Sequence, residues 1–137
     1  MERGISLQAV KDGEIIFTSN KFGIMPAYQF YKKGIEFTAE TQIEDKVTGK
    51  GSAMLLSSAG CSEIKTGLIS QEAFGILEKK GIKVQYEEIA PYIINRTGDG
   101  KCPVETMLEG IDDLEEGLPL MEKFLKKIWG EDLDELS

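Results

Sequence analysis

The fold is decided by residues 62–86, which read SEIKTGLISQEAFGILEKKGIKVQY. Residues 62–69 have the β-branched and apolar content of a strand, and residues 82–86 predict a second one. Between them, Ser70 is a good N-cap for a helix over residues 71–80, and Gly81 is a suitable stop. A strand, a short helix and a strand predict a βαβ unit, whose crossover requires the two strands to be parallel.

The residues on either side of this unit predict further elements. Residues 5–10 and 14–18 flank Asp12-Gly13, a pair typical of a tight hairpin turn. The other elements that we expect are helices over 25–33, 45–58 and 115–129, a helix that opens at Pro103, a strand over 35–38 and a loop over 88–101. Together they predict an α/β fold, a three-layer α/β/α sandwich. Its mixed sheet of four or five strands would start with a β-hairpin and have helices on both faces.

The chain has 137 residues, which is enough for one domain with its own core. We expect this domain to span residues 1–130 and an acidic C-terminal tail to follow over residues 131–137. Residues 109–137 contain ten acids and three bases, so this segment carries −7 of the total charge of −8. No basic footprint for nucleic acid is visible, and an anionic membrane surface would repel the segment. The segment is either a solvated terminus or a site for a basic partner.

Composition also excludes several classes of enzyme. The chain has no histidine, so Ser-His-Asp and Cys-His triads and histidine-ligated metal sites are excluded. Its two cysteines alone cannot supply a zinc site of three or four thiolates. We therefore expect no metal and no other cofactor. Since there is no export signal and no apolar run of about 18 residues, we expect a cytoplasmic protein with free thiols.

The first candidate functional segment is NRTGDGKCPVE, residues 95–105. Cys102 precedes a proline at the first helical position, so it occupies or borders the N-cap, and Glu105 lies at N3 as in a capping box. A helix N-terminus with Arg96 nearby favours a reactive thiolate, and the glycine-rich loop directs N–H groups toward an anionic ligand. The alternative is a surface turn that enters a capped helix, with Cys102 as a small buried side chain.

The second candidate segment is DKVTGK, residues 45–50. Lys46 and Lys50 would lie on one face of the predicted helix near its N-terminus, where cations are unfavourable unless an anion offsets them. A phosphate or carboxylate ligand would do so, as would the N-cap Asp45 or exposure to solvent. Gly49 and Gly51 indicate close approach of the backbone to a ligand, or else tight packing of the helix on the sheet.

Together the two segments resemble a small bacterial family of unknown function within the cytidine-deaminase-like fold. The resemblance covers residues 4–111 and rests on Asp45-Lys46-Val47-x-Gly49-Lys50, Ile94-Asn95-Arg96 and Cys102-Pro103-x-Glu105. It implies a hairpin, a helix on the sheet and then alternating strands and helices. Zinc deaminases have a His (or Cys)-x-Glu motif at the start of the second core helix and Pro-Cys-x-x-Cys at the next. The corresponding residues 45–50 and 69–72 contain no zinc ligand pair, so the resemblance implies a fold and a site position but not zinc-dependent deamination.

These observations predict a site for an anionic or nucleotide-like small molecule at the carboxyl ends of the parallel strands. Cys102 would be the nucleophile or thiol donor, Asp45 would orient a lysine or transfer a proton, and Lys46 is the third catalytic candidate. The candidate ligand-binding residues are Gly49, Lys50, Asn95 and Arg96. The alternative is a non-catalytic module that binds a ligand or a partner. The helix over 115–129 is a candidate surface for a homo-oligomer.

Overall fold

The predicted βαβ unit is present in the computed structural model, which describes residues 4–33, 41–95 and 97–130. It consists of β4 (Glu63–Ser70), α3 (Gln71–Lys79) and β5 (Lys83–Ala90), and its strands are parallel. The Ser70 hydroxyl accepts a hydrogen bond from the Ala73 N–H at 3.2 Å, as an N-cap does. Because β5 continues to Ala90, the loop expected from residue 88 begins later than we predicted.

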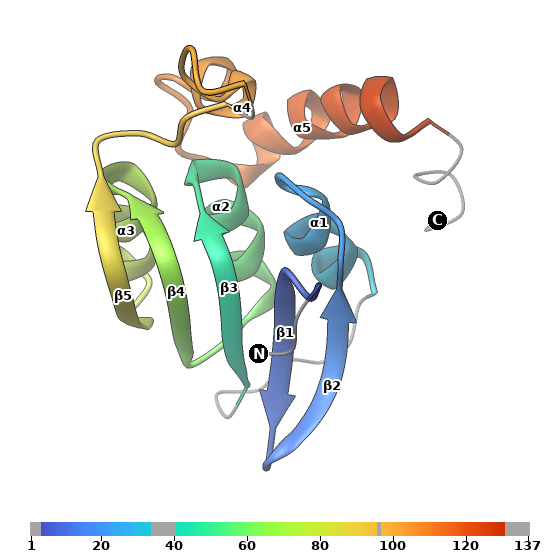
Figure 1. Cartoon of the computed structure of the whole chain (residues 1–137), viewed down its shortest axis with the longest axis vertical. Coiled ribbons are helices and arrows are strands. Elements are labelled where there is room, and N and C mark those ends of the chain that lie inside the picture. The colour runs from blue at the N-terminus through green and yellow to red at the C-terminus, as the bar shows by residue number, and fades with distance from the viewer. Residues whose placement is uncertain (1–3, 34–40, 96, 131–137) are drawn as a thin grey trace.

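The predicted hairpin is also present, as β1 (Leu7–Lys11) and β2 (Glu14–Ser19). Its turn requires positive φ at both central residues, and Asp12 and Gly13 have φ angles of 53° and 79°. The pairing shifts register between Ala9 and Val10, a bulge that increases the local twist. The hairpin joins the parallel strands through β1, giving a mixed five-stranded sheet in the order β2-β1-β3-β4-β5 (Figure 1).

The prediction of a helix over residues 45–58 is wrong for the first residues of this range. Residues Gln42–Thr48 form the strand β3, and the helix α2 spans Lys50–Ala59 with Gly49 as its N-cap residue. β3 pairs with β1 on one side and with β4 on the other, so hydrogen bonding between strands decides its conformation over any local helix signal. Asp45 is therefore a strand residue. The strand expected over 35–38 lies outside the described residues.

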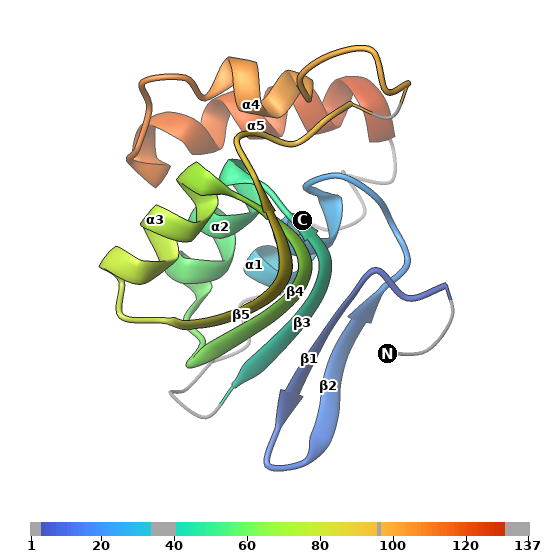
Figure 2. The ribbon, with the colours of Figure 1, turned by 60° about the vertical axis from the view of Figure 1, so that its left-hand side comes forward.

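Helices cover one face of the sheet. The helix expected over 25–33 is confirmed as α1 (Met25–Lys32), and it lies with α2 and α3 on the same side (Figure 2). The three-layer sandwich that we expected is not shown, because no helix among the described residues lies on the opposite face, which we call the open face. Strand register places Glu44, Lys65 and Gln85 side by side there. A polar row of this kind needs no apolar cover.

Two helices form a cap over the end of the sheet at which β3, β4 and β5 finish (Figures 1 and 2). They are α4 (Pro103–Met107) and α5 (Leu114–Trp129). Side chains of the cap and of Leu108, which ends α4, belong to the main apolar core; those buried are Val104, Leu108, Met121 and Leu125. The cap is therefore an integral part of the domain. Within the described ranges, no helix is both long and apolar enough to cross a membrane.

Gly51 lets α2 approach its neighbours closely. A Cβ atom there would lie 2.9 Å from Val104 Cγ1, 3.0 Å from Ile24 Cγ2 and 3.1 Å from Met121 Sδ. Of the two interpretations of this glycine, tight packing agrees with these contacts, although α2 packs here against the cap and the start of α1 and not against the sheet.

We predict that Gly51→Ala lowers the free energy of unfolding by about 1–3 kcal/mol, because the added methyl group overpacks a dense core. Gly75→Ala is the matched control: Gly75 also lies in a helix, and a Cβ there would meet nothing within 4 Å. That variant should gain about 0.5–1 kcal/mol, since alanine restricts the unfolded chain. Urea denaturation followed by circular dichroism measures both, and effects of the same sign would contradict the packing account.

Candidate functional site

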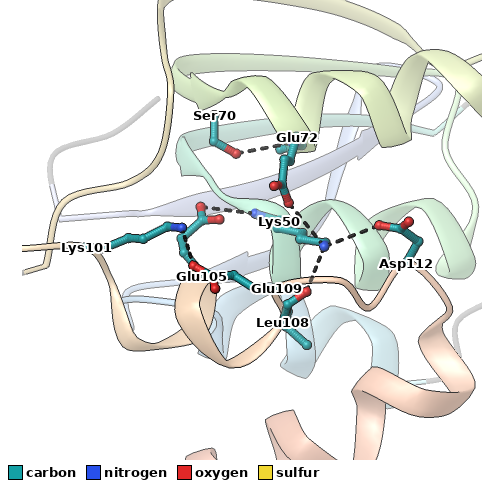
Figure 3. A network of polar contacts seen from close by, with 9 residues as sticks. Lys50, Ser70, Glu72, Lys101, Glu105, Leu108, Glu109 and Asp112 are labelled. Carbon is teal, nitrogen blue, oxygen red and sulfur yellow. Dashed lines mark hydrogen bonds and ion pairs between the residues drawn. The ribbon is translucent and has the colours of Figure 1, made fainter.

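The carboxyl ends of β3 and β4 meet a buried lysine at the start of α2 (Figure 3). The Lys50 side chain is 2% exposed, and its Nζ donates a hydrogen bond to the Leu108 carbonyl at 2.7 Å. The same Nζ lies 3.1 Å from a carboxylate oxygen of Glu72 and 3.3 Å from one of Asp112. Glu72 belongs to α3, and the other two partners belong to the segment between α4 and α5. Lys50 therefore links α2, α3 and the cap.

The surroundings of Lys50 are acidic. The buried Glu105 carboxylate accepts the Lys50 backbone N–H at 3.4 Å. Burial raises the pKa of Glu105, and the N–H groups of Lys50 and Ile93 lower it in part. Lys101 forms an ion pair with Glu109 at 2.7 Å. The two ammonium groups are thus accompanied by four carboxyl groups, those of Glu72, Glu105, Glu109 and Asp112. This excess of negative charge disfavours an anionic ligand.

The Asn95 side chain hydrogen-bonds within its own loop. Its Nδ2 donates to Asp99 Oδ1 at 2.9 Å, and its Oδ1 accepts from the Thr97 hydroxyl at 3.1 Å and from the Asp99 N–H at 3.2 Å. These contacts close a turn in which Gly98 has a φ of 77°. Asn95 therefore has an evident role in loop structure. The neighbouring Arg96 lies outside the described residues.

Cys102 is the N-cap residue of α4 and is half-buried against the core. Its N–H donates to the Ile93 carbonyl at 2.8 Å. The capping box that we expected is not formed, because the Glu105 carboxylate binds the N–H of Lys50 in place of that of Cys102. Both cysteines are free, and burial raises the pKa of the Cys61 thiol to about 12. The contacts of Cys102 are those of a packing residue.

Asp45 is a buried acid on β3. The Thr48 hydroxyl donates to its Oδ2 at 2.8 Å and lies 3.0 Å from the Thr66 hydroxyl. Burial raises the pKa of Asp45 to about 7, although hydrogen bonds from Thr48 and from the N–H groups of Val47 and Lys46 oppose the shift. The Lys46 side chain is exposed. Because successive side chains of a strand point to opposite faces, the Lys46 ammonium and the Asp45 carboxyl diverge.

A groove of about 330 Å³ lies over β3, β4 and β5. It is lined by Glu44, Asp45, Lys65, Thr66, Gly67, Gln85, Tyr86 and Glu87. Gly67 keeps it open, because a Cβ there would lie 3.0 Å from the Lys46 carbonyl oxygen and 3.9 Å from a Glu87 carboxylate oxygen. Of the predicted site residues that the structure describes, Asp45 is the one that lines this groove.

The structure brings part of the predicted site together. Gly49 and Lys50 contact Glu105, since a Cβ at Gly49 would lie 2.9 Å from Glu105 Oε1. The segments around residues 49 and 105 therefore converge, while Asp45 belongs to the groove and Lys46 to neither place. The groove residues Lys65, Gly67, Gln85 and Glu87 are absent from the predicted set. The one signal for them in the sequence is Gly67, because an isolated glycine inside a strand often marks a close approach.

We predict that the free energy of unfolding of wild type falls relative to that of Asp45→Asn as the pH rises from about 4 to about 7. The fall should reach a few kcal/mol, since each pKa unit contributes about 1.4 kcal/mol. The sign follows from the raised pKa of Asp45, because the folded protein binds a proton in this range that the unfolded chain releases. Thr48→Val removes a donor that lowers the pKa, so it should extend the fall to higher pH. Urea denaturation across this range measures the differences, and a flat difference curve would contradict the burial of the carboxyl group.

Comparison with known proteins identifies the family. A family model described as "Domain of unknown function (DUF1893)" matches residues 1–125. Among solved structures, a DUF1893 family protein (TM1506) from Thermotoga maritima is 27% identical, with a TM-score of 0.79 over 85% of this chain and 78% of that chain. No match was found among curated proteins. Since the family model spans most of the sequence, the chain belongs to the DUF1893 family.

Proposed function

We propose that the protein is a non-catalytic binding module whose ligand occupies the groove over β3, β4 and β5. The observation that carries this proposal is the groove itself, which has the volume of a small-molecule site at the low end of the usual range and gathers Glu44, Lys65, Gln85 and Glu87 on the open face. The Asp45 carboxyl group lies on the helix side, where the strand register places it beside Leu7 and Thr66, so the polar lining of the open face supports the proposal without it.

The positions of the catalytic candidates favour binding over thiol chemistry. Asp45 accepts hydrogen bonds within β3, Lys46 is exposed, and Cys102 lies at the start of α4. A nucleophile needs a base within hydrogen-bond reach, and no contact joins Cys102 to Asp45 or Lys46 among the described residues. The groove, by contrast, gathers polar side chains from three neighbouring strands.

We place this module in the cytidine-deaminase-like fold as part of the same proposal. The order of a hairpin, a helix and then alternating strands and helices supports it. The residues at the starts of α2 and α3, where the resemblance implies zinc ligands, do not fit zinc. Lys50 and Glu72 meet there as an ion pair, and an ammonium group is not a metal ligand. At this position the Lys50 ammonium group supplies the positive charge that a zinc ion supplies in the zinc deaminases.

The chemistry of the lining indicates a small polar ligand that carries both charges. Lys65 is exposed, with its Nζ at a distant 4.0 Å from the Glu63 carboxylate, so it can still bind an acceptor group. Glu87 offers a carboxylate on the far side of Gly67, and Gln85 offers both an amide donor and an acceptor. A zwitterion such as a free amino acid matches these groups. This assignment replaces the anionic ligand, since Lys50 and Lys101 are already paired with carboxylates of the chain.

We predict that free amino acids at millimolar concentration shift the backbone amide signals of Glu44, Lys65, Gly67 and Gln85 in nitrogen–proton correlation spectra. The probes are amino acids and, in parallel samples, nucleoside monophosphates. Lys65→Glu should weaken binding at least about tenfold, because it replaces an attractive charge by a repulsive one. Cys102→Ser should leave the affinity unchanged.

Lys79→Glu is the matched control for this experiment. Lys79 is an exposed lysine at the end of α3, and it does not line the groove. Equal losses in Lys65→Glu and Lys79→Glu would mean that the effect is a general change of surface charge. Shifts gathered around Lys50, Asn95 and Cys102, or no response to any probe, would overturn the proposal.

A further inference from the structure

β5 is an edge strand with an unpaired outer side. In the sheet order it stands last, and within the described residues it pairs with β4 alone. The Lys83 N–H donates to the Ser62 carbonyl at 3.1 Å, so the backbone of Lys83 points toward β4. Because these directions alternate along a strand, the N–H and C=O groups of Val84, Tyr86 and Glu88 point outward. Such a row of donors and acceptors is a template for another strand.

The side chains of β5 also alternate between two kinds of surface. Val84 is half-buried on the helix side, where the Tyr86 ring meets the Phe74 ring edge-on at 5.7 Å between centroids. Tyr86 remains 43% exposed despite this contact. Lys83 and Glu87 lie on the open face, two residues to either side of Gln85. At Val84 and Tyr86 the edge is thus apolar on the helix side, and at Lys83 and Glu87 it carries two opposite charges on the open face.

From this pattern we infer that β5 pairs with β5 of a second copy of the chain, antiparallel and with a twofold axis at Gln85. In this register Lys83 faces Glu87 of the second copy, and by symmetry the same contact forms twice. Val84 faces Tyr86 of the second copy on the helix side, next to Phe74. The outward N–H and C=O groups of Val84 and Tyr86 then form a hydrogen-bonded pair, and the two Gln85 residues form a non-hydrogen-bonded pair.

The registers centred on the residues next along β5 bring together side chains that match less well, and this favours the register centred on Gln85. An axis at Glu87 brings two like charges together, and an axis at Tyr86 places Val84 opposite Glu88. The register centred on Gln85 is the one that matches charges and apolar groups at once. The edge of β5 is therefore complementary in charge to the same edge of a second copy of the chain. Pairing of the two edges would join the two sheets into one continuous sheet.

We predict that the full-length protein is a dimer by light scattering coupled to size-exclusion chromatography at micromolar concentration. Lys83→Glu and Glu87→Lys should each weaken dimerisation at least about tenfold, because each replaces two cross-strand attractions by repulsions. The double variant restores opposite charges and should recover the dimer. Lys65→Glu is the control, since Lys65 is near Glu63, as Lys83 is, but lies on β4, away from the edge.

A monomeric wild type at every concentration would overturn the inference, as would a double variant that stays as weak as the single ones. The register has a test of its own. Gln85→Cys should form a disulfide-linked dimer on mild oxidation, because the two Cβ atoms face each other across the axis. Lys65→Cys should give no more linked dimer than wild type, whose Cys61 and Cys102 set the background. Equal linkage in the two variants would exclude the register centred on Gln85.

Discussion

The ammonium group of Lys50 has lost nearly all contact with water, and this constraint determines how the helices meet at the end of the sheet. Lys50 follows β3 after a single residue, so the chain carries a positive charge into the core as soon as the strand ends. Oxygen atoms from three other places replace its water: the Leu108 carbonyl and the carboxylates of Glu72 and Asp112. Removing the partners of a buried charge generally costs about 3–5 kcal/mol. The cap is therefore fixed to the body by charge as well as by apolar packing.

Asp45 is a second buried ionisable group, and it lies on β3, the strand that precedes Lys50. Among the described residues, no ammonium group forms an ion pair with Asp45. Its carboxyl group accepts hydrogen bonds from a hydroxyl and from N–H groups instead. Its pKa of about 7 means that the charge of this part of the core depends on pH near neutrality.

Local signals in the sequence predicted the elements that depend on local chemistry. Asp12-Gly13 indicated the hairpin because its turn requires unusual φ angles, and Ser70 indicated α3 because its hydroxyl caps the helix. β3 could not be predicted in this way, because pairing with strands distant in sequence decides its conformation. The motifs predict the convergence of residues 49 and 105, but they leave open whether a ligand, Asp45 or solvent offsets the charge of Lys50, and its partners are other carboxylates of the chain. Periodicity does not show which partner a buried charge selects.

The bulge between Ala9 and Val10 makes the two borders of the sheet unlike each other. β5 offers eight residues, whereas β2 offers six and is paired through a twisted, irregular ladder. A sheet extended through β5 would have a β2 hairpin at each end, and bulged borders are poor templates for addition of another strand. In such a dimer, growth would stop at two chains. The irregular hairpin would then act as a terminator that keeps the extended sheet from open-ended, fibre-like polymerisation.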